Sequence, residues 1–317
     1  MLDTGEIVSG ILRGDPRSIS RAVSIMETMP GSAERRKILE AIYPNTGNGQ
    51  IIGITGPPGI GKSTMIGKLS LSIAQKGHKI GVVAVDASSP FSNGSILGNR
   101  LRMQDSLTSR NIFMRSLSTR GQRGGLSSTV WDTVTIMEAS GMDKIIVETV
   151  GSGQADLDIL GLADTIVLVL APGLGDEIQA IKAGIMEIAS IIVVNKIDRE
   201  GAYMAMKDIQ DMLAINSADG WVIPVIGTNA LTGDGLEDLM GCMEKHWIYL
   251  HEHVNIRESR FRNTVAMDAR IQLDQIVQRS FQRALQGMET IPGKNGSPYD
   301  ESNSIVKKTI ESILKGG

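Results

Sequence analysis

A glycine-rich turn early in the chain holds the residues best suited to chemistry. Gly56, Gly61, Lys62 and Ser63 stand in the pattern G-x-x-x-x-G-K-[ST], directly after an apolar run at residues 51–55. In such a loop, backbone N–H groups point at phosphate oxygens, the lysine reaches the β- and γ-phosphates, and the serine hydroxyl binds Mg²⁺. The residues predicted to bind phosphate are Gly56, Pro57, Pro58, Gly59, Ile60, Gly61, Lys62, Ser63 and Thr64.

A second motif, Asn195-Lys196-Ile197-Asp198, follows a later apolar run and indicates which base is bound. The carboxylate of Asp198 only accepts hydrogen bonds, so it suits N1–H and N2–H of guanine. Adenine has an acceptor at N1 and no amino group at C2, and a polar group left unpaired in this way gives strong discrimination. We expect the Lys196 stem to lie over the base and Asn195 to join the base loop to the phosphate loop. The motif predicts GTP rather than ATP.

A third segment, Gly227-Thr228-Asn229-Ala230, is expected to follow a strand at residues 222–225 and to offer a backbone N–H to guanine O6. Asn229 stands where such loops usually carry Ser. The contact is therefore assigned first to Ala230 and then to Asn229.

Acidic residues end two of the predicted strands. Asp86 closes the run at residues 80–86, and Glu148 closes the run at residues 144–148. Carboxylates that face phosphates need a cation between them, so Mg²⁺ or its bound waters are the natural partner; the alternative is that each carboxylate caps a helix. Gly151 has no Cβ, so its N–H can approach the γ-phosphate. The candidate catalytic residues are Lys62, Glu148 and Gly151, acting by positioning and charge stabilisation.

Seven apolar runs and the helical patterns between them must position these residues. Most runs are continuous and rich in β-branched residues, which is typical of strands buried on both faces of a parallel sheet. We predict an α/β fold of the P-loop NTPase type, with a doubly wound, mostly parallel sheet and the ligand at the carboxyl ends of the strands. The predicted strands are residues 51–55, 80–86, 112–115, 144–148, 165–171, 191–195 and 222–225.

Helical segments flank this region, so we expect an N-terminal arm at residues 1–49, a GTPase domain at 50–249 and a C-terminal tail at 250–317. In the arm, Asp15 and Pro16 predict a helix start, and a second helix is expected at residues 33–42. The arm is either a partner surface or a helical layer packed on the sheet. The tail predicts a helix at residues 257–288, a break at 291–298 and a helix at 301–314, suited to dimerisation or docking rather than folding back on the domain.

Composition excludes several other classes. The chain has 317 residues, 41% hydrophobic content and a net charge of −3, with no basic footprint for nucleic acid. The lone Cys242 excludes an internal disulfide framework and fits a reducing compartment. No apolar run reaches the roughly 18 residues of a membrane span. We therefore expect a cytoplasmic protein with neither nucleic acid nor membrane as partner.

Two further groups have competing interpretations. His246, His251 and His253 suggest a metal site with nearby Glu252, but a solvated helix face is the favoured interpretation. Arg120 and Arg123 lie among glycines, and an arginine finger supplied in cis is weighed against ordinary solvation of a surface loop, which is preferred.

The motifs together resemble the MeaB-type methylmalonyl-CoA mutase-associated GTPases, formerly labelled arginine/ornithine transport kinases, over nearly the whole chain. Besides the phosphate loop and the N-K-x-D motif, the resemblance rests on further strings. They are Gly94-Ser95-Ile96-Leu97-Gly98, Glu148-Thr149-Val150-Gly151-Ser152-Gly153-Gln154 and Gly175-Asp176-Glu177-Ile178-Gln179-Ala180-Ile181-Lys182, and a fourth, shorter string is Val85-Asp86-Ala87-Ser88-Ser89.

This resemblance implies a homodimeric GTPase that chaperones an adenosylcobalamin-dependent acyl-CoA mutase, most commonly methylmalonyl-CoA mutase, by gating cofactor loading and ejecting damaged cofactor. It implies a Mg²⁺ shell of Ser63, Asp86 and Glu148. It also implies switch residues Gln154, Asp176 and Lys182. The family has Asp at the position of Asn99, which is linked to Mg²⁺, so switching or turnover is expected to differ here.

Two alternatives stay open at this point. A metal-insertion GTPase for a nickel enzyme needs a Cys/His site, which the lone Cys242 does not favour. A transport-associated kinase needs an acceptor for the γ-phosphate, and the sequence contains no visible acceptor or catalytic-base motif.

Overall fold

The computed structural model describes residues 3–29, 31–86, 111–118, 128–149, 159–173, 189–215, 220–286 and 298–314. The chain divides into two compact units, Met1–Arg260 and Phe261–Gly317, and each is described by itself. The predicted division at residues 49 and 249 stays a prediction.

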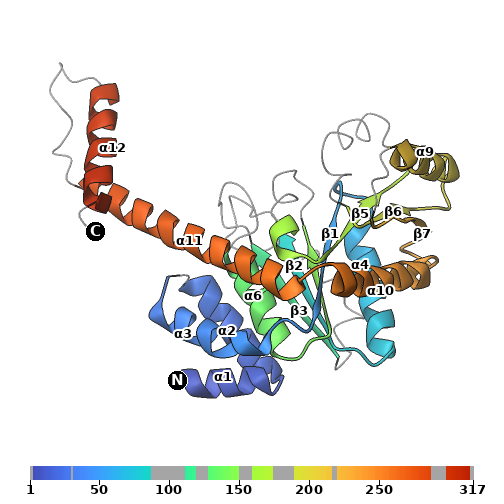
Figure 1. Ribbon diagram of the computed structural model, residues 1–317, viewed down its shortest axis with the longest axis horizontal. Helices are drawn as coiled ribbons and strands as arrows, with labels where there is room; N and C mark the ends of the chain where they lie inside the picture. The colour runs from blue at the N-terminus through green and yellow to red at the C-terminus, as the bar shows by residue number, and fades with distance from the viewer. Residues whose placement is uncertain are drawn as a thin grey trace. The chain divides into compact units, whose positions relative to one another are not determined.

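A sheet of seven parallel strands forms the centre of the first unit (Figure 1). The strands are β1 (Gln50–Thr55), β2 (Ile80–Asp86), β3 (Ile112–Ser118), β4 (Lys144–Glu148), β5 (Thr165–Leu170), β6 (Ile191–Asn195) and β7 (Val225–Thr228). Their spatial order is β3-β2-β4-β1-β5-β6-β7, and every neighbouring pair is parallel. The predicted α/β class is confirmed.

The strand order places the end of β1 at the reversal point of the sheet. Strands β2 to β4 lie on one side of β1 and strands β5 to β7 on the other. Connections from neighbouring strands diverge at such a point, and the crevice beyond their carboxyl ends is where open α/β sheets bind ligands. The phosphate loop predicted from the sequence follows β1 directly.

Each face of the sheet is covered by its own apolar cluster. Along β1, Ile52 and Ile54 pack in the cluster that includes α4 (Lys62–Gln75) and α10 (Leu236–His253). Ile51, on the alternate face, packs in the cluster that includes α6 (Ser128–Ala139) and the N-terminal helices. Because side chains alternate along a strand, the two buried faces require the unbroken apolar run that β1 carries.

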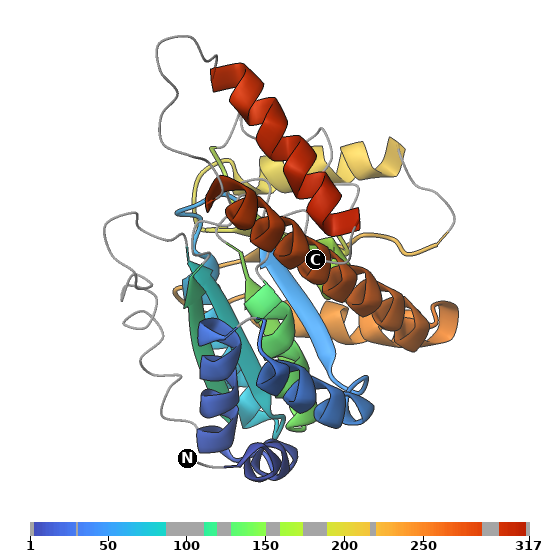
Figure 2. The same ribbon diagram turned by 90° about the vertical axis from the view of Figure 1, so that its left-hand side faces the viewer.

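The N-terminal helices form a layer on the α6 face, which is one of the two arrangements considered for the arm. They are α1 (Thr4–Leu12), α2 (Pro16–Thr28) and α3 (Ala33–Ile42), followed by the 3₁₀ turn η1 (Tyr43–Asn45), and both views draw them beside α6 (Figure 2). Asp15 caps α2, accepting from the backbone N–H groups of Arg17 and Ser18. The Arg35 guanidinium forms two hydrogen bonds with Asp132 of α6, at 2.7 and 2.8 Å. This buried ion pair anchors the layer.

Two predicted strand bounds are wrong by three residues, while β1 begins one residue before its predicted start and β5 ends one residue before its predicted end. β3 continues to Ser118 instead of ending at Arg115, because it stays in register with β2 to its last residue. The predicted strand at residues 222–225 lies too early: Val222 is 81% exposed, and β7 is Val225–Thr228. Ladder pairing decides this bound, since Thr228 pairs with Asn195.

The remaining described helices are α9 (Ala202–Ile215), α11 (Ile256–Gln286) and α12 (Pro298–Leu314). The predicted C-terminal pair of helices is therefore present.

Arg260, in the first turns of α11, bonds to Asp164, Glu138 and the Gly49 carbonyl. Burial works against its cation, but the two carboxylates outweigh burial and raise the Arg260 pKa. Among the described helices, none is long and apolar enough to cross a membrane.

Candidate nucleotide-binding site

The loop between β1 and α4 has the backbone that the glycine pattern predicts. Gly56 has a φ of 142°, and a Cβ there would lie 2.1 Å from the Val169 carbonyl oxygen of β5. Gly61 has a φ of 100°, and a Cβ there would lie 2.6 Å from the Asn195 amide nitrogen. At both positions a side chain is excluded by φ and by contact, so glycine is required.

Lys62 and Ser63 begin α4 directly after this loop. The ammonium of Lys62 is turned back into the loop, where it donates to the carbonyls of Gly56 at 2.6 Å and Pro57 at 3.0 Å. The residue is only 7% exposed. The helix N-terminus and this ammonium place two sources of positive potential on one loop, which is the electrostatic requirement for binding phosphate.

Ser63 and Glu148 meet at the carboxyl ends of β1 and β4. The Ser63 hydroxyl donates to Oε1 of Glu148 at 2.6 Å, and Glu148 is 5% exposed. Hydroxyl and carboxylate oxygens are the hard ligands that Mg²⁺ prefers, so this pair of side chains fits a Mg²⁺ site. The backbone of Asp86 ends β2, while its side chain lies outside what the structure describes.

Asn195, the last residue of β6, connects two loops of the predicted site. Its amide nitrogen donates to the Ile60 carbonyl at 2.6 Å. Its Oδ1 accepts from the Ala230 backbone N–H at 2.9 Å and from the Thr228 hydroxyl at 3.2 Å. Asn195 is 1% exposed. The phosphate loop and the Ala230 loop therefore have a fixed separation, set by one side chain.

Lys196 has a left-handed backbone, with a φ of 61°. Its ammonium donates to the Gly59 carbonyl of the phosphate loop at 3.0 Å, so its stem spans the space between the two motifs. A positive φ in a residue other than glycine costs free energy. The strain is located where the motif turns from β6 toward Asp198.

Asn229, which stands where such loops usually carry Ser, has a structural role that the sequence did not predict. Its amide nitrogen donates to Oδ1 of Asp198 at 3.0 Å, and its own Oδ1 accepts from the backbone N–H groups of Leu231 and Thr232 at 2.9 and 3.3 Å. These two acceptor contacts determine which way the amide faces. Asn229 thus orients the carboxylate predicted to recognise guanine.

Several predicted site residues lie outside the described residues. They are Asn99, Arg120, Arg123, Gly151, Gln154, Asp176 and Lys182.

The histidines are not arranged as a common metal site. His246 is 5% exposed and bonds through Nδ1 to the Thr165 hydroxyl at 2.9 Å, so the expectation that it lies on a solvated helix face is wrong. Burial lowers the His246 pKa to about 4. His251 and His253 are exposed, and Nδ1 of each lies within 3 Å of a backbone carbonyl one turn earlier, of Trp247 and Tyr249 respectively. Among the described residues, no group of three His, Cys, Asp or Glu side chains is placed to hold a metal ion.

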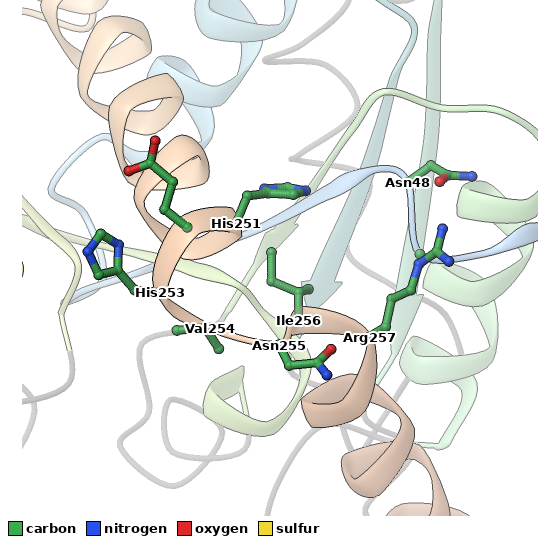
Figure 3. A pocket seen from close by; sticks show the side chains of 9 residues that line it. Asn48, His251, His253, Val254, Asn255, Ile256 and Arg257 are labelled. Carbon is green, nitrogen blue, oxygen red and sulfur yellow. The ribbon is translucent and has the colours of Figure 1, made fainter.

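A separate cavity of about 620 Å³ lies near the amino end of β1, away from the phosphate loop (Figure 3). His251 and His253 line it together with Asn48 and Arg257, and Figure 3 shows the two imidazoles pointing to different sides of the end of α10. Because the phosphate loop follows the opposite end of the strand, this cavity is not part of the nucleotide site.

Comparison with known proteins agrees with these motifs. A putative GTPase of Pyrococcus horikoshii is 40% identical over 313 residues, covering 96% of this chain and 98% of the relative. The mouse mitochondrial methylmalonic aciduria type A homolog is 30% identical, covering 75% of this chain and 62% of the relative. A crystal structure of a LAO/AO transport system kinase has the same fold, with a TM-score of 0.69 at 22% identity over 97% of this chain and 98% of that one.

The family model described as methylmalonyl Co-A mutase-associated GTPase MeaB matches residues 19–284. That span contains the phosphate loop, the Ser63–Glu148 pair and the Asn195–Asp198 motif. The chain therefore belongs to the MeaB family of P-loop GTPases.

Proposed function

We propose that this chain hydrolyses GTP to GDP and phosphate with Mg²⁺, and that it uses this reaction to chaperone an adenosylcobalamin-dependent acyl-CoA mutase. The observation that carries the GTP assignment is Asn195, which ties the phosphate loop to the loop that would receive guanine. In that arrangement Asp198 accepts from N1–H and N2–H of the base. In this structure the Ala230 N–H donates to Asn195 Oδ1 and the Asn229 N–H to the Asp234 carbonyl, so either would reach guanine O6 only by sharing or exchanging that hydrogen bond.

The residues at the phosphate end act by position and charge. Lys62 would leave the carbonyls of Gly56 and Pro57 and donate to the β- and γ-phosphates, an exchange that keeps its hydrogen bonds satisfied. Ser63 and Glu148 would hold Mg²⁺, with Asp86 and Asn99 as further candidate ligands. When bound, Mg²⁺ would neutralise part of the negative charge on the phosphates. Gly151 would offer its N–H to the γ-phosphate.

The proposed client follows from the family. The matching family is described as methylmalonyl Co-A mutase-associated, so methylmalonyl-CoA mutase is the first partner to test. The mouse relative is named for methylmalonic aciduria type A. In this proposal Gln154, Asp176 and Lys182 report the nucleotide state to the mutase, which gates cofactor loading and supports reactivation.

We further propose that the protein is a homodimer joined through its C-terminal tail. In the second unit α11 exposes apolar side chains at spacings of three or four residues and their multiples, which is typical of one face of a helix. Such a face is stable in water when a second surface covers it. The exposed residues are Phe261, Val265, Leu273, Ile276, Val277 and Phe281. Sedimentation of a Val265→Glu, Leu273→Glu double variant tests this: a monomer is expected, and an unchanged dimer overturns the proposal.

Two alternatives predict different outcomes. A metal-insertion GTPase would need a Cys/His metal site, and the described part of the chain holds no such cluster. A transport-associated kinase would transfer the γ-phosphate to an acceptor, whereas hydrolysis releases it as free phosphate.

The test is GTP turnover of the purified protein, alone and with methylmalonyl-CoA mutase in its apo and cofactor-loaded forms. Using GTP labelled at the γ-phosphate, we expect free labelled phosphate, slow turnover alone and a several-fold increase with the mutase. The Asp198→Asn variant is the control, because it should lose GTP selectivity without altering the phosphate loop. Label on a protein would support the kinase, and turnover that ignores every cobalamin mutase would overturn the chaperone role.

A further inference from the structure

Two threonines form a buried hydrogen bond beside the phosphate loop. The hydroxyl of Thr149, the residue after β4, donates to Oγ1 of Thr55, the last residue of β1, at 3.0 Å. Both residues are 1% exposed. The Thr149 backbone N–H also donates to the Ile54 carbonyl at 3.1 Å. A side-chain bond and a backbone bond therefore hold the end of β4 against the end of β1.

The threonine pair lies on the opposite face of the sheet from Ser63 and Glu148. Side chains alternate between faces along a strand, so Thr149 points away from Glu148 and Thr55 away from Ile54. Ile54 packs in the apolar cluster that includes α4, the helix that carries Ser63. The Thr55–Thr149 bond thus joins the ends of β1 and β4 on one face, and the Ser63–Glu148 bond joins the end of β4 to α4 on the other.

We propose that Thr149, through its bond to Thr55, is a positioning residue for the Glu148 carboxylate. Glu148 and Thr149 share a peptide bond, so a rotation or shift of Thr149 also moves Glu148 relative to Ser63. This inference rests on the proposed role of Ser63 and Glu148 as Mg²⁺ ligands. Mg²⁺ requires near-ideal octahedral geometry at about 2.0–2.1 Å, so it is sensitive to a small displacement of one ligand.

The informative variant is Thr149→Val, which keeps the shape of the side chain and removes the hydroxyl. The measurement is the dissociation constant of a fluorescent GDP analogue, titrated with Mg²⁺ and repeated in EDTA. We expect the half-saturating Mg²⁺ concentration to rise about three- to tenfold, the loss expected for one buried hydrogen bond. Affinity in EDTA should stay within about twofold of wild type, because the phosphate loop itself is unchanged.

Three further variants separate positioning from general stability. Thr149→Ser restores the hydroxyl and should restore the Mg²⁺ dependence. Thr133→Val is the matched control, because Thr133 is fully buried and its hydroxyl donates to the Thr129 carbonyl inside α6 at 2.6 Å. It should change the melting temperature and leave the Mg²⁺ titration unchanged. Thr55→Val removes the acceptor from the other strand and should reproduce the Thr149→Val shift, including when Thr149→Val does not fold.

The outcomes are distinguishable from failure of the proposed function. A wild-type protein whose nucleotide affinity does not depend on Mg²⁺ overturns the metal role of Ser63 and Glu148, and this inference with it. A wild-type protein that depends on Mg²⁺, with a Thr149→Val variant of unchanged Mg²⁺ dependence, overturns only the positioning role. An equal loss of affinity with and without Mg²⁺ overturns it as well.

Discussion

Replacing Asn195 by alanine should separate the two halves of the nucleotide site. Asn195 is 1% exposed and bonds to the Ile60 carbonyl, the Ala230 N–H and the Thr228 hydroxyl. The substitution removes the amide and leaves β6 intact. Two backbone groups, one on each loop, then lose the partner that held the loops together.

The size of the effect follows from those two groups. A buried polar group left unsatisfied costs about 1–3 kcal/mol, so two cost about 2–6 kcal/mol. Because water that enters between the loops offsets part of the cost, we take the lower half of this range, about 2–4 kcal/mol. If the loss falls on the bound state, affinity for GDP drops about 30- to 700-fold.

The assay is the dissociation constant of a fluorescent GDP analogue, with urea unfolding of the nucleotide-free protein measured in parallel. Asn229→Ala is the comparison variant: its hydrogen bond to Asp198 is exposed, so its loss of affinity should stay below about tenfold. An Asn195→Ala protein that binds GDP within about threefold of wild type would refute the reasoning. Strand pairing alone would then suffice to hold the loops.

Three other changes have defined outcomes. Asp198→Asn should lower GTP affinity about 100-fold and raise affinity for xanthosine triphosphate in competition binding, because an amide replaces one acceptor by a donor. Arg35→Met should cost about 3–5 kcal/mol in urea unfolding by leaving Asp132 buried without its bidentate partner, and adding Asp132→Leu should recover most of that loss. For His246, whose pKa falls from 6.5 to about 4, the unfolded chain binds a proton in this pH interval and the folded chain does not. The free energy of unfolding should therefore show no His246-dependent loss above about pH 6.5 and should decrease by up to about 3 kcal/mol as the pH falls to 4. In the His246→Asn variant the free energy of unfolding should depend less on pH over this range.

The Ser63–Glu148 and Thr55–Thr149 pairs show how the end of β4 can serve two purposes. One face carries the groups suited to a cation, and the other carries a neutral hydrogen bond that is shielded from water. A neutral pair holds the strands without adding charge near the phosphates. We expect substitutions of Ser63 or Glu148 to change the Mg²⁺ dependence of nucleotide binding more than substitutions of Thr55 or Thr149 do, and the two groups to differ less in the free energy of unfolding.

The sequence alone predicted the elements whose information is local. The phosphate loop depends on glycines at fixed spacing, and the structure shows why at Gly56 and Gly61, where a Cβ would clash. The buried strands were recognisable because a parallel sheet covered on both faces needs continuous apolar runs. The capped start of α2 at Asp15 was also recognisable, because a cap and the N–H groups it satisfies are neighbours in sequence.

Only the tertiary structure decided the contacts between distant segments. Arg35 and Asp132 are 97 residues apart, Thr55 and Thr149 are 94 apart, and Asn229 reaches Asp198 over 31 residues. None of these pairs follows from local spacing, because the order and register of the strands determine which side chains meet. The correct bounds of β7 belong here too: a short edge strand has a weak apolar pattern, and pairing with β6 determines where it begins and ends.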